Sequence, residues 1–546
     1  MAGFYRSKYL VDGETRFMAA TQFEATDARR AFFCVDEPKA KAIFDLTFLI
    51  PKTHTVVSNT HIENIKEHES GYKLVSFAPT PKMSTYLVAY IIGELDFLET
   101  KTKEETIVRV FVTPGKKAQA RFALEIASKM LSYYNDYFGI KYPMAVLDLI
   151  AIPDFAAGAM ENWGAITYRE TALLIDPKHS SAAAKQRVAL VIAHELAHQW
   201  FGNLVTMRWW THLWLNEGFA SWIEYLAVDH LFPEWEIWTQ FVYADLNRAL
   251  ELDALQNTHP VEVEVSHPKE IGEIFDAISY SKGASIIRML ADYLGEDDFR
   301  KGLNIYLTRY KFDNATTLHL WDAFEEASGK SVRNLMQKWT KTSGYPLVSV
   351  AKSKDGRVKL KQKRFYSSIL ENKKVSPKVF WNIPISYTSG INAEKRYVLM
   401  TKPECVLEER FSNSDWLNLN ASQSGVFRTL YEDTFLAPLQ SAVEEKRIGP
   451  VDRLSLVNDS FAMSRAGFSD TSKTLELLVS YKKENNYTVW RDLATQLDDL
   501  DNILFGEEFY LKFQTYIQSI FADIVGKVGW IKKPRDGHLD SLLREL

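Results

Sequence analysis

Residues 188–202 read VALVIAHELAHQWFG and predict a buried helix that ends at Gly202, because they are apolar on nearly every side. The stretch nevertheless carries His194, Glu195 and His198, and buried polar groups need partners. His194 and His198 are one turn apart on one face, which suits two imidazole ligands of a zinc ion. Glu195 beside them is placed to take a proton from water. The alternative is a pair of helix histidines capped by carboxylates, without a metal.

A catalytic zinc site needs a third protein ligand and leaves one position for water. Glu217 follows His198 after eighteen residues, on a second apolar helix expected from about His212 to Leu231. Glu224 lies two turns further along the same face. We therefore predict that Glu217 is the third ligand and that Glu224 accepts a hydrogen bond from a ligand histidine. We expect the neighbouring aromatic side chains to be core packing around these helices: Trp200, Phe201, Trp209, Trp210 and Trp214.

The hydrophobic periodicity changes along the chain and predicts segments in the order β, α, β, α. Alternation with period two predicts strands near the N-terminus, and helical spacing follows from Ala118 to about Ser343. A second strand-rich stretch is followed by helices after Gly449-Pro450. The clearest predicted strands are Lys73–Ala78, Tyr86–Phe97 and Thr106–Val112, the second strand-rich stretch is Leu347–Phe427, and the clearest late helices are Tyr487–Phe505 and Glu507–Val525.

The composition is that of an ordinary globular chain of several domains. Its 546 residues are 46% hydrophobic and 25% charged, with a net charge of −5, so disorder, a coiled coil and a nucleic-acid partner are poor interpretations. Two cysteines, Cys34 and Cys405, exclude a disulfide framework and favour a reducing compartment. No apolar run approaches the roughly 20 residues of a membrane span.

Beyond the histidine helix, four further motifs occur together: GAMEN at Gly158–Asn162, NEGFA at Asn216–Ala220, SYSKG at Ser279–Gly283 and TQFEATDARR at Thr21–Arg30. With HELAHQW at His194–Trp200 they make the chain resemble the zinc aminopeptidases of the gluzincin clan, most of all the puromycin-sensitive branch. The resemblance covers essentially the whole sequence. Because members of this family begin earlier and end later, it also implies a chain that is truncated at both ends.

The resemblance implies an α+β multidomain fold. Its parts are an incomplete N-terminal β-sheet saddle domain, a thermolysin-like zinc catalytic domain, a small β-sandwich and the start of a C-terminal helical-repeat domain. We place them at residues 1–98, 99–345, 346–435 and 436–546.

The resemblance also implies roles for residues outside the metal helices. Glu24 and Glu161 stand where the family binds the protonated amine of a peptide, and Tyr280 stands where it stabilises the oxyanion. Without the family, Glu24 would be a solvated glutamate at a strand end, and Tyr280 a core tyrosine with its hydroxyl satisfied. We expect Gly158 and Ala159 to lie along the substrate backbone, and Met160 and Gln22 to line the first side-chain pocket.

The function implied is a zinc metalloaminopeptidase that removes single N-terminal residues from peptides. It uses one zinc ion per chain, water as the nucleophile and Glu195 as general base. We expect peptide substrates with a free amine, no nucleic-acid partner and a cytoplasmic location, and the oligomeric state is open. One alternative is a truncated homologue that binds peptides or partners with little turnover. Another is a relative whose anchor was lost with its N-terminus.

Overall fold

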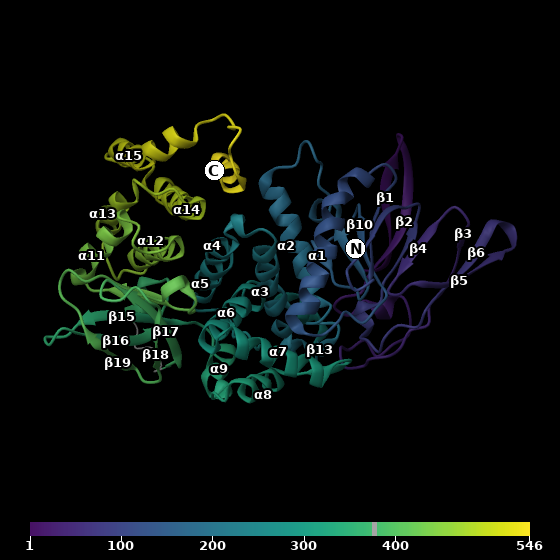
Figure 1. Cartoon of the computed structure of the whole chain (residues 1–546), viewed down its shortest axis with the longest axis horizontal. Coiled ribbons are helices and arrows are strands. Elements are labelled where there is room, and N and C mark those ends of the chain that lie inside the picture. Colours follow the sequence, from purple (N-terminus) through teal and green to yellow (C-terminus); the bar gives the residue numbers. More distant parts are fainter. Residues whose placement is uncertain (374–378) are drawn as a thin grey trace. The chain divides into compact units, whose positions relative to one another are not determined.

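The computed structural model describes residues 1–373 and 379–546, in which two compact units form (Figure 1). The first unit comprises Met1–Pro233, Glu262–Tyr280 and Gly295–Arg333, and the second comprises Glu234–Val261, Ser281–Leu294 and Asn334–Leu546. Both units contain helices and sheets, so the predicted multidomain α+β class is confirmed. The domain boundaries drawn at residues 98, 345 and 435 remain predictions.

Two small sheets form the N-terminal part of the first unit. The four-stranded sheet has the order β1 (Gly3–Val11), β2 (Glu14–Gln22), β7 (Tyr90–Gly93) and β4 (Thr55–Ser58). The three-stranded sheet has the order β3 (Thr47–Pro51), β6 (Tyr72–Phe77) and β5 (Ile62–His68).

The single strand predicted at Tyr86–Phe97 is wrong. The chain there forms a 3-10 turn at Thr85–Leu87, then β7, then the start of β8 (Asp96–Lys101). The side chains of Tyr86, Leu87 and Val88 are all buried. This stretch is therefore apolar because all of its side chains lie in the core, and not because buried and exposed side chains alternate along a strand.

A five-stranded sheet, in the order β11-β12-β10-β9-β8, also belongs to the first unit. Strands β9 (Ile107–Val112), β10 (Val146–Ile152) and β12 (Ala165–Arg169) run parallel, and β8 and β11 (Ala159–Met160) are antiparallel edges. Every residue of β10 is buried, as expected of a central strand. The buried carboxylate of Asp148 in β10 accepts two hydrogen bonds of 2.7 Å from Arg109 in β9. The short edge strand β11 carries the GAMEN motif.

Three long helices carry or support the histidine motif. Helix α2 (Ala182–His198) begins where the Ser181 hydroxyl accepts a hydrogen bond from the Ala184 amide, and it ends a turn before Gly202. Helix α3 (Trp214–Leu231) follows a 3-10 turn at Trp210–His212, close to the predicted start. Helix α1 (Arg121–Phe138) braces both, because the Tyr134 hydroxyl lies 2.9 Å from the Ala193 carbonyl of α2 and 3.4 Å from the Ile223 carbonyl of α3.

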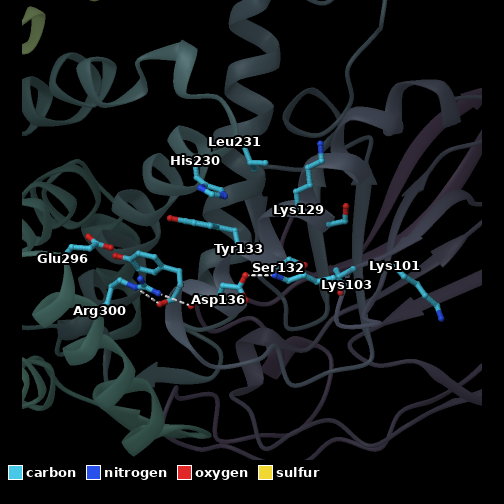
Figure 2. A pocket seen from close by; sticks show the side chains of 13 residues that line it. Lys101, Lys103, Lys129, Ser132, Tyr133, Asp136, His230, Leu231, Glu296 and Arg300 are labelled. Carbon is cyan, nitrogen blue, oxygen red and sulfur yellow. Dashed lines mark hydrogen bonds and ion pairs between the residues drawn. The ribbon is translucent and has the colours of Figure 1, made fainter.

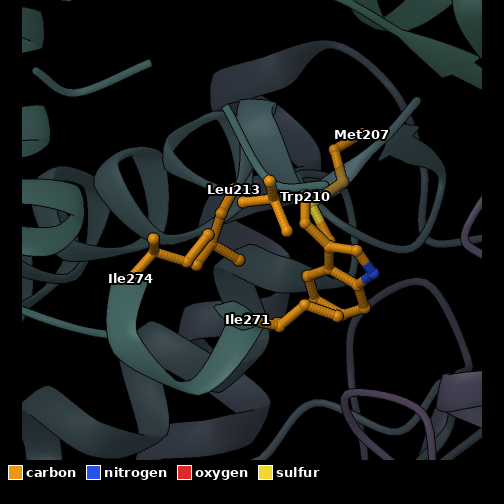
Figure 3. Packing of buried hydrophobic residues seen from close by; sticks show 6 residues of the cluster. Met207, Trp210, Leu213, Ile271 and Ile274 are labelled. Atoms are coloured by element: carbon orange, nitrogen blue, oxygen red, sulfur yellow. The ribbon is translucent and has the colours of Figure 1, made fainter. Parts of the chain in front are cut away.

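An apolar cluster supports the start of α3. Its buried members are Met207, Trp210, Leu213, Val265, Ile271 and Ile274. Figure 3 shows Ile271, from the 3-10 helix at Pro268–Ile274, reaching the ring of Trp210. Ala25 and Phe275 pack against the cluster from outside. The cluster therefore braces two segments at once, the one that follows Glu24 and the one that leads to Tyr280.

The rest of the first unit consists of α7 (Glu296–Tyr310), α8 (Thr317–Ser328) and the paired strands β13 (Val205–Met207) and β14 (Asp313–Ala315).

The second unit combines two sheets with a run of helices (Figure 1). The sheets have the orders β19-β16-β15-β21 and β18-β17-β20 and fall in the second predicted strand-rich stretch, of which residues 374–378 lie outside the described residues. Their strands are β15 (Pro346–Lys352), β16 (Arg357–Arg364), β17 (Ile383–Ser389), β18 (Arg396–Met400), β19 (Glu404–Arg410), β20 (Leu417–Leu419) and β21 (Arg428–Tyr431). The later helices are α11 (Asp433–Glu444), α12 (Pro450–Arg465), α13 (Thr471–Leu478), α14 (Tyr487–Leu504), α15 (Tyr510–Val528) and α16 (His538–Glu545).

A buried polar network ties helices α12 and α14 to strand β21 within this unit. The Arg428 guanidinium lies 2.8 Å from Asp459 and 2.9 Å from Asn458, whose amide donates to Asp492 at 2.8 Å. These side chains are nearly inaccessible to solvent.

Among the described residues, no helix is both long and apolar enough to cross a membrane.

Candidate active site

Two histidines of α2 and one glutamate of α3 converge on one point in the first unit. His194 Nε2 lies 3.1 Å from His198 Nε2, and each of these nitrogens lies 3.3 Å from Glu217 Oε2. The His198 and Glu217 side chains are almost fully buried, and that of His194 is 14% exposed. The structure thus brings together the three residues predicted to be ligands.

The far nitrogen of each imidazole has its own partner. His194 Nδ1 lies 2.7 Å from Glu224 Oε2, and His198 Nδ1 lies 2.9 Å from the carbonyl oxygen of Phe201. Both partners can accept an Nδ1 proton, so Nε2 is the nitrogen of each ring that faces Glu217. Glu224 therefore stands where the sequence placed it, beside a predicted ligand and away from the point of convergence.

The three converging atoms fit a zinc ion. Zinc takes nitrogen and carboxylate ligands at about 2.0–2.1 Å in a tetrahedron, and the edge of such a tetrahedron is about 3.3 Å. The observed separations of 3.1–3.3 Å match that edge. Two imidazoles and one carboxylate are also a donor set that catalytic zinc sites use, with a fourth position for water or substrate.

Burial and mutual charge shift the pKa of each of these groups. Burial raises the pKa of Glu217, but the two imidazoles outweigh it and bring that pKa to about 2. Burial lowers the pKa of His198, but Glu161 and Glu217 bring it up to about 9. The pKa of His194 is also raised, because hydrogen bonds to Glu217 and Glu224 outweigh burial. Attraction between the two imidazoles and the Glu217 carboxylate therefore explains the directions of all three pKa shifts.

Three more glutamates surround the same point. Donor atoms of Glu161, Glu195 and His198 lie within 4.8 Å of one another, as do those of Glu24, Glu161 and Glu217. One carboxylate oxygen of each of Glu24, Glu161 and Glu195 is buried without a hydrogen-bond partner among the described residues. Burial raises the pKa of Glu195 to about 8 although the imidazoles lower it, and burial with the neighbouring carboxylates raises the pKa of Glu24 well above its usual range. Glu24 is thus no solvated strand-end glutamate.

The GAMEN segment forms one wall of this acidic pocket. Ala159 and Met160 pair with Tyr168 and Thr167 of β12, and β11 is the edge of its sheet. Gly158 and Ala159 are partly exposed, whereas Met160 is buried. Gln22 is the last residue of β2, and its side-chain oxygen is buried without a partner among the described residues.

Tyr280 lies against helix α2 at His194. Its ring stacks on His194 with centroids 6.1 Å apart and planes 7° apart, and it also contacts Phe275. Burial and the Glu217 carboxylate raise its pKa well above the usual value, so the phenol remains a hydrogen-bond donor. Tyr280 thus lies beside the converging residues, and its role toward an oxyanion remains a prediction.

Sequence reasoning missed two amides that brace the site. Asn203 Nδ2 donates to the main-chain oxygen of Glu161 at 2.8 Å. Gln199 Nε2 donates to the same oxygen at 3.3 Å and to the Glu195 carbonyl at 3.0 Å. The available signal was a buried glutamine and asparagine at the end of an apolar helix, since buried amides need partners.

A separate hollow of about 720 Å³ lies at the other end of α3 (Figure 2). It is lined by residues of β8, α1, α3 and α7, and Tyr133 stacks on His230 there with centroids 4.2 Å apart. His230 follows Glu217 by thirteen residues, about 20 Å along the helix. None of the predicted site residues lines this hollow, so it is distinct from the acidic pocket.

Three domain families match separate parts of the chain and together cover most of it. Residues 122–339 match the Peptidase family M1 domain, and residues 1–87 match the Peptidase M1 N-terminal domain. Residues 416–546 match the ERAP1-like C-terminal domain. The first of these ranges contains the converging histidines and glutamates.

Curated relatives match along the length of the chain. Aminopeptidase M1-A of Oryza sativa subsp. japonica is 46% identical over 557 residues, which cover 100% of this chain and 62% of the relative. Puromycin-sensitive aminopeptidase of Caenorhabditis elegans is 44% identical, over 90% of this chain and 52% of the relative. Alanine/arginine aminopeptidase of Saccharomyces cerevisiae is 42% identical, over 97% of this chain and 61% of the relative. The chain thus spans 52–62% of the length of these three relatives. The family resemblance predicted from the five motifs is confirmed, because the chain carries a peptidase family M1 domain together with an M1 N-terminal domain and an ERAP1-like C-terminal domain.

Proposed function

We propose that this chain is a zinc aminopeptidase that removes single residues from the N-terminus of peptides. The observation that carries the proposal is the tight convergence of His194, His198 and Glu217 beside the carboxyl groups of Glu24 and Glu161. The first group holds a divalent cation, and the second binds an ammonium group. Both features in one pocket are what hydrolysis next to a free amine requires. The names of the relatives support the same activity.

His194, His198 and Glu217 would hold the zinc ion. When bound, the ion supplies a Lewis acid that polarises the scissile carbonyl and acidifies water. Glu224 and the Phe201 carbonyl keep both imidazoles in the tautomer that offers Nε2 as a ligand.

Glu195 is the general base of the proposed reaction. Its Oε2 is buried and has no partner among the described residues, so it is free to accept a proton from the attacking water. Burial raises the pKa of Glu195 and the imidazoles moderate that rise, which favours a group that takes up a proton and passes it on. The protonated carboxyl then delivers its proton to the departing amine nitrogen.

The remaining residues orient the substrate. Glu24 and Glu161 accept hydrogen bonds from its ammonium group, which sets the cut one residue from the end. Gly158 and Ala159 lie along the substrate backbone, and Met160 and Gln22 line the pocket of the first side chain. The Tyr280 phenol donates to the carbonyl oxygen as that oxygen gains negative charge.

Hydrolysis of a chromogenic aminoacyl anilide, measured alongside its N-acetylated form, tests the proposal. We expect the 546-residue chain to release the chromogen only from the free-amine form, with one zinc per chain by metal analysis. Glu195→Gln should reduce kcat by at least a hundredfold while zinc stays bound, and Glu125→Gln on the exposed face of α1 should change nothing. A folded, zinc-loaded chain that binds peptides without turnover would contradict the proposal and favour a binding protein.

We also propose that the protein acts in the cytoplasm. Cys34 and Cys405 are both free thiols, which is usual in reducing compartments. Cell fractionation with an antibody against the chain tests this, and recovery with membranes or secreted material would contradict it.

A further inference from the structure

The main-chain oxygen of Glu161 has an unusual pair of partners. Strand β11 ends at Met160, so Glu161 lies beyond the last ladder pair with β12. Its carbonyl therefore finds no strand partner in that pairing and accepts from two side-chain amides instead, Asn203 at 2.8 Å and Gln199 at 3.3 Å. All three residues are buried.

Both amides come from the end of the helix that carries Glu195. Gln199 immediately follows α2, and Asn203 lies in the turn after it. The main-chain N–H of Asn203 donates to the His198 carbonyl at 3.0 Å. Gln199 also donates to the Glu195 carbonyl at 3.0 Å and accepts from the Gly164 amide at 3.3 Å. The two amides thus tie the segment from Glu161 to Gly164 directly to α2.

Such a tie matters because strand pairing does little to hold Glu161 in place. The Glu161 carboxylate lies within 4.8 Å of donor atoms of Glu24, Glu217 and Glu195. The strand β11 has only two residues and ends before Glu161, so the ladder with β12 does not fix that residue. Hydrogen bonds to the Glu161 main chain fix its position and leave the carboxylate free.

We propose that Gln199 and Asn203 are positioning residues that hold Glu161 in place to bind the N-terminal ammonium group of the substrate. This inference rests on the proposed function, because it assigns the amine to Glu161. Neither amide bonds to an imidazole or carboxylate of the predicted metal ligands among the described contacts, so their effect is on amine binding and not on zinc.

A pair of ligands that differ only in the amine isolates this effect. L-Leucinol carries a free ammonium group and no scissile bond, and 4-methylpentan-1-ol is the same molecule without the amine. Calorimetric titration of the zinc-loaded chain should show tighter binding of L-leucinol. Asn203→Ala should weaken L-leucinol binding about tenfold and leave 4-methylpentan-1-ol within twofold, because one buried hydrogen bond to the anchor is lost. Zinc affinity, measured by chelator competition, should stay unchanged.

A double-mutant cycle shows whether the amides act through Glu161. In a Glu161→Gln background, Asn203→Ala should cause no further loss of L-leucinol binding. Gln199→Met keeps the side-chain length but removes both donated bonds, and it carries the test if Asn203→Ala does not fold. Asn304→Ala is the matched control, since Asn304 donates to the Phe138 carbonyl at 2.7 Å away from the pocket.

The outcomes separate this inference from the proposed function. If wild-type protein binds L-leucinol and 4-methylpentan-1-ol equally, the assignment of the amine fails, and both ideas are overturned. If wild type discriminates but the folded Asn203→Ala and Gln199→Met variants discriminate equally well, only the positioning role is overturned. A parallel loss of zinc affinity, or additive losses in the Glu161→Gln background, would also overturn it in favour of a general structural role.

Discussion

At the scale of single residues, the candidate active site is marked by buried carboxylate oxygens that lack hydrogen-bond partners among the described residues. Glu24, Glu161 and Glu195 each bury one carboxylate oxygen that has no partner among the described residues. A buried polar atom without a partner calls for an explanation, and three of them in one cluster point to a bound ligand or water. All three oxygens belong to one pocket, so their missing partners are best supplied by positively charged or hydrogen-donating ligands.

The amine anchor is tested most directly by Glu161→Gln. This change keeps the shape of the side chain but removes the charge that strengthens its hydrogen bond to an ammonium group. We expect kcat/KM for a free-amine substrate to fall about 10–100-fold, since a hydrogen bond to a charged group contributes about 1.5–3 kcal/mol. Steady-state kinetics on the anilide checks this, and zinc content should equal that of wild type. An unchanged kcat/KM would assign the amine to another group.

Asp492 of α14 predicts a pH dependence of stability that is independent of catalysis. Burial raises its pKa to about 7, although hydrogen bonds from Asn458 and the charge of Arg428 lower it. The folded state therefore binds this proton more tightly than the unfolded state, whose carboxyl titrates near about 3.9. The contribution to stability is fully present below about pH 4 and is lost as pH rises to about 7, on the order of 4 kcal/mol in all.

Asp492→Asn should remove that pH dependence, because the amide mimics the protonated carboxyl. Between pH 5 and 8 the free energy of unfolding of the variant should fall less than that of wild type in urea titrations. Asp498→Asn, on the exposed face of the same helix, should behave as wild type. Parallel curves for wild type and Asp492→Asn would contradict a raised pKa in the folded state.

Local spacing explains which residues could be predicted from the sequence. His194, His198, Glu217 and Glu224 follow helical periodicity, so their faces could be assigned before any tertiary contact was known. Asn203 could not be assigned a partner, because its bond to Glu161 joins residues 42 positions apart. Glu24 is intermediate: its motif suggested a role, but only the fold brings it to Glu161 and Glu217.

At the scale of elements, regular patterns were predicted accurately: β6 and β9 lie within one residue of the strands predicted at Lys73–Ala78 and Thr106–Val112. The late helices at Tyr487–Leu504 and Tyr510–Val528 lie within a few residues of their predicted ends, since their patterns are long and amphipathic. Tyr86–Phe97 was misread because a buried turn and a short strand give the same apolar pattern as one long strand. The region from Ala118 onward also contains β10, β11 and β12, which the dominance of helical spacing concealed.

Close packing of helices α7 and α8 gives a prediction about one glycine. A Cβ added at Gly302 of α7 would lie 2.3 Å from Cδ1 of Phe324 in α8. Gly302→Ala should therefore destabilise the protein by about 1–3 kcal/mol despite the better helix propensity of alanine. Gly526→Ala in α15 meets no atom within 4 Å and should stabilise by about 0.5–1 kcal/mol. Thermal unfolding of both variants checks the pair, and adding Phe324→Leu should recover part of the loss at Gly302.

At the scale of the whole molecule, every residue of the proposed site belongs to the first compact unit. The unit is assembled from three separate stretches of chain, and Tyr280 is the last residue of the second stretch. The integrity of the site therefore depends on the folding of this unit. The chain also spans only 52–62% of the three relatives named above, so its activity must be measured on this chain itself.

Zinc should stabilise the folded chain by mass action. At a free concentration of about one hundred times Kd, binding to the folded state alone contributes about 2.7 kcal/mol. Chelator-treated protein should therefore unfold at a lower temperature, and added zinc should restore the Tm. Scanning fluorimetry of wild type and Glu217→Ala checks this. An equal response of the two proteins to zinc would contradict the predicted ligand set.

Glu217 and Glu224 sit on a single rod of chain, α3, with the ring of His194 reaching both. A small rotation of α3 would therefore move the proposed carboxylate ligand and the hydrogen-bond partner of His194 in the same event. For a chain that binds zinc as proposed, we expect metal release and the melting of α3 to coincide on heating in a single transition.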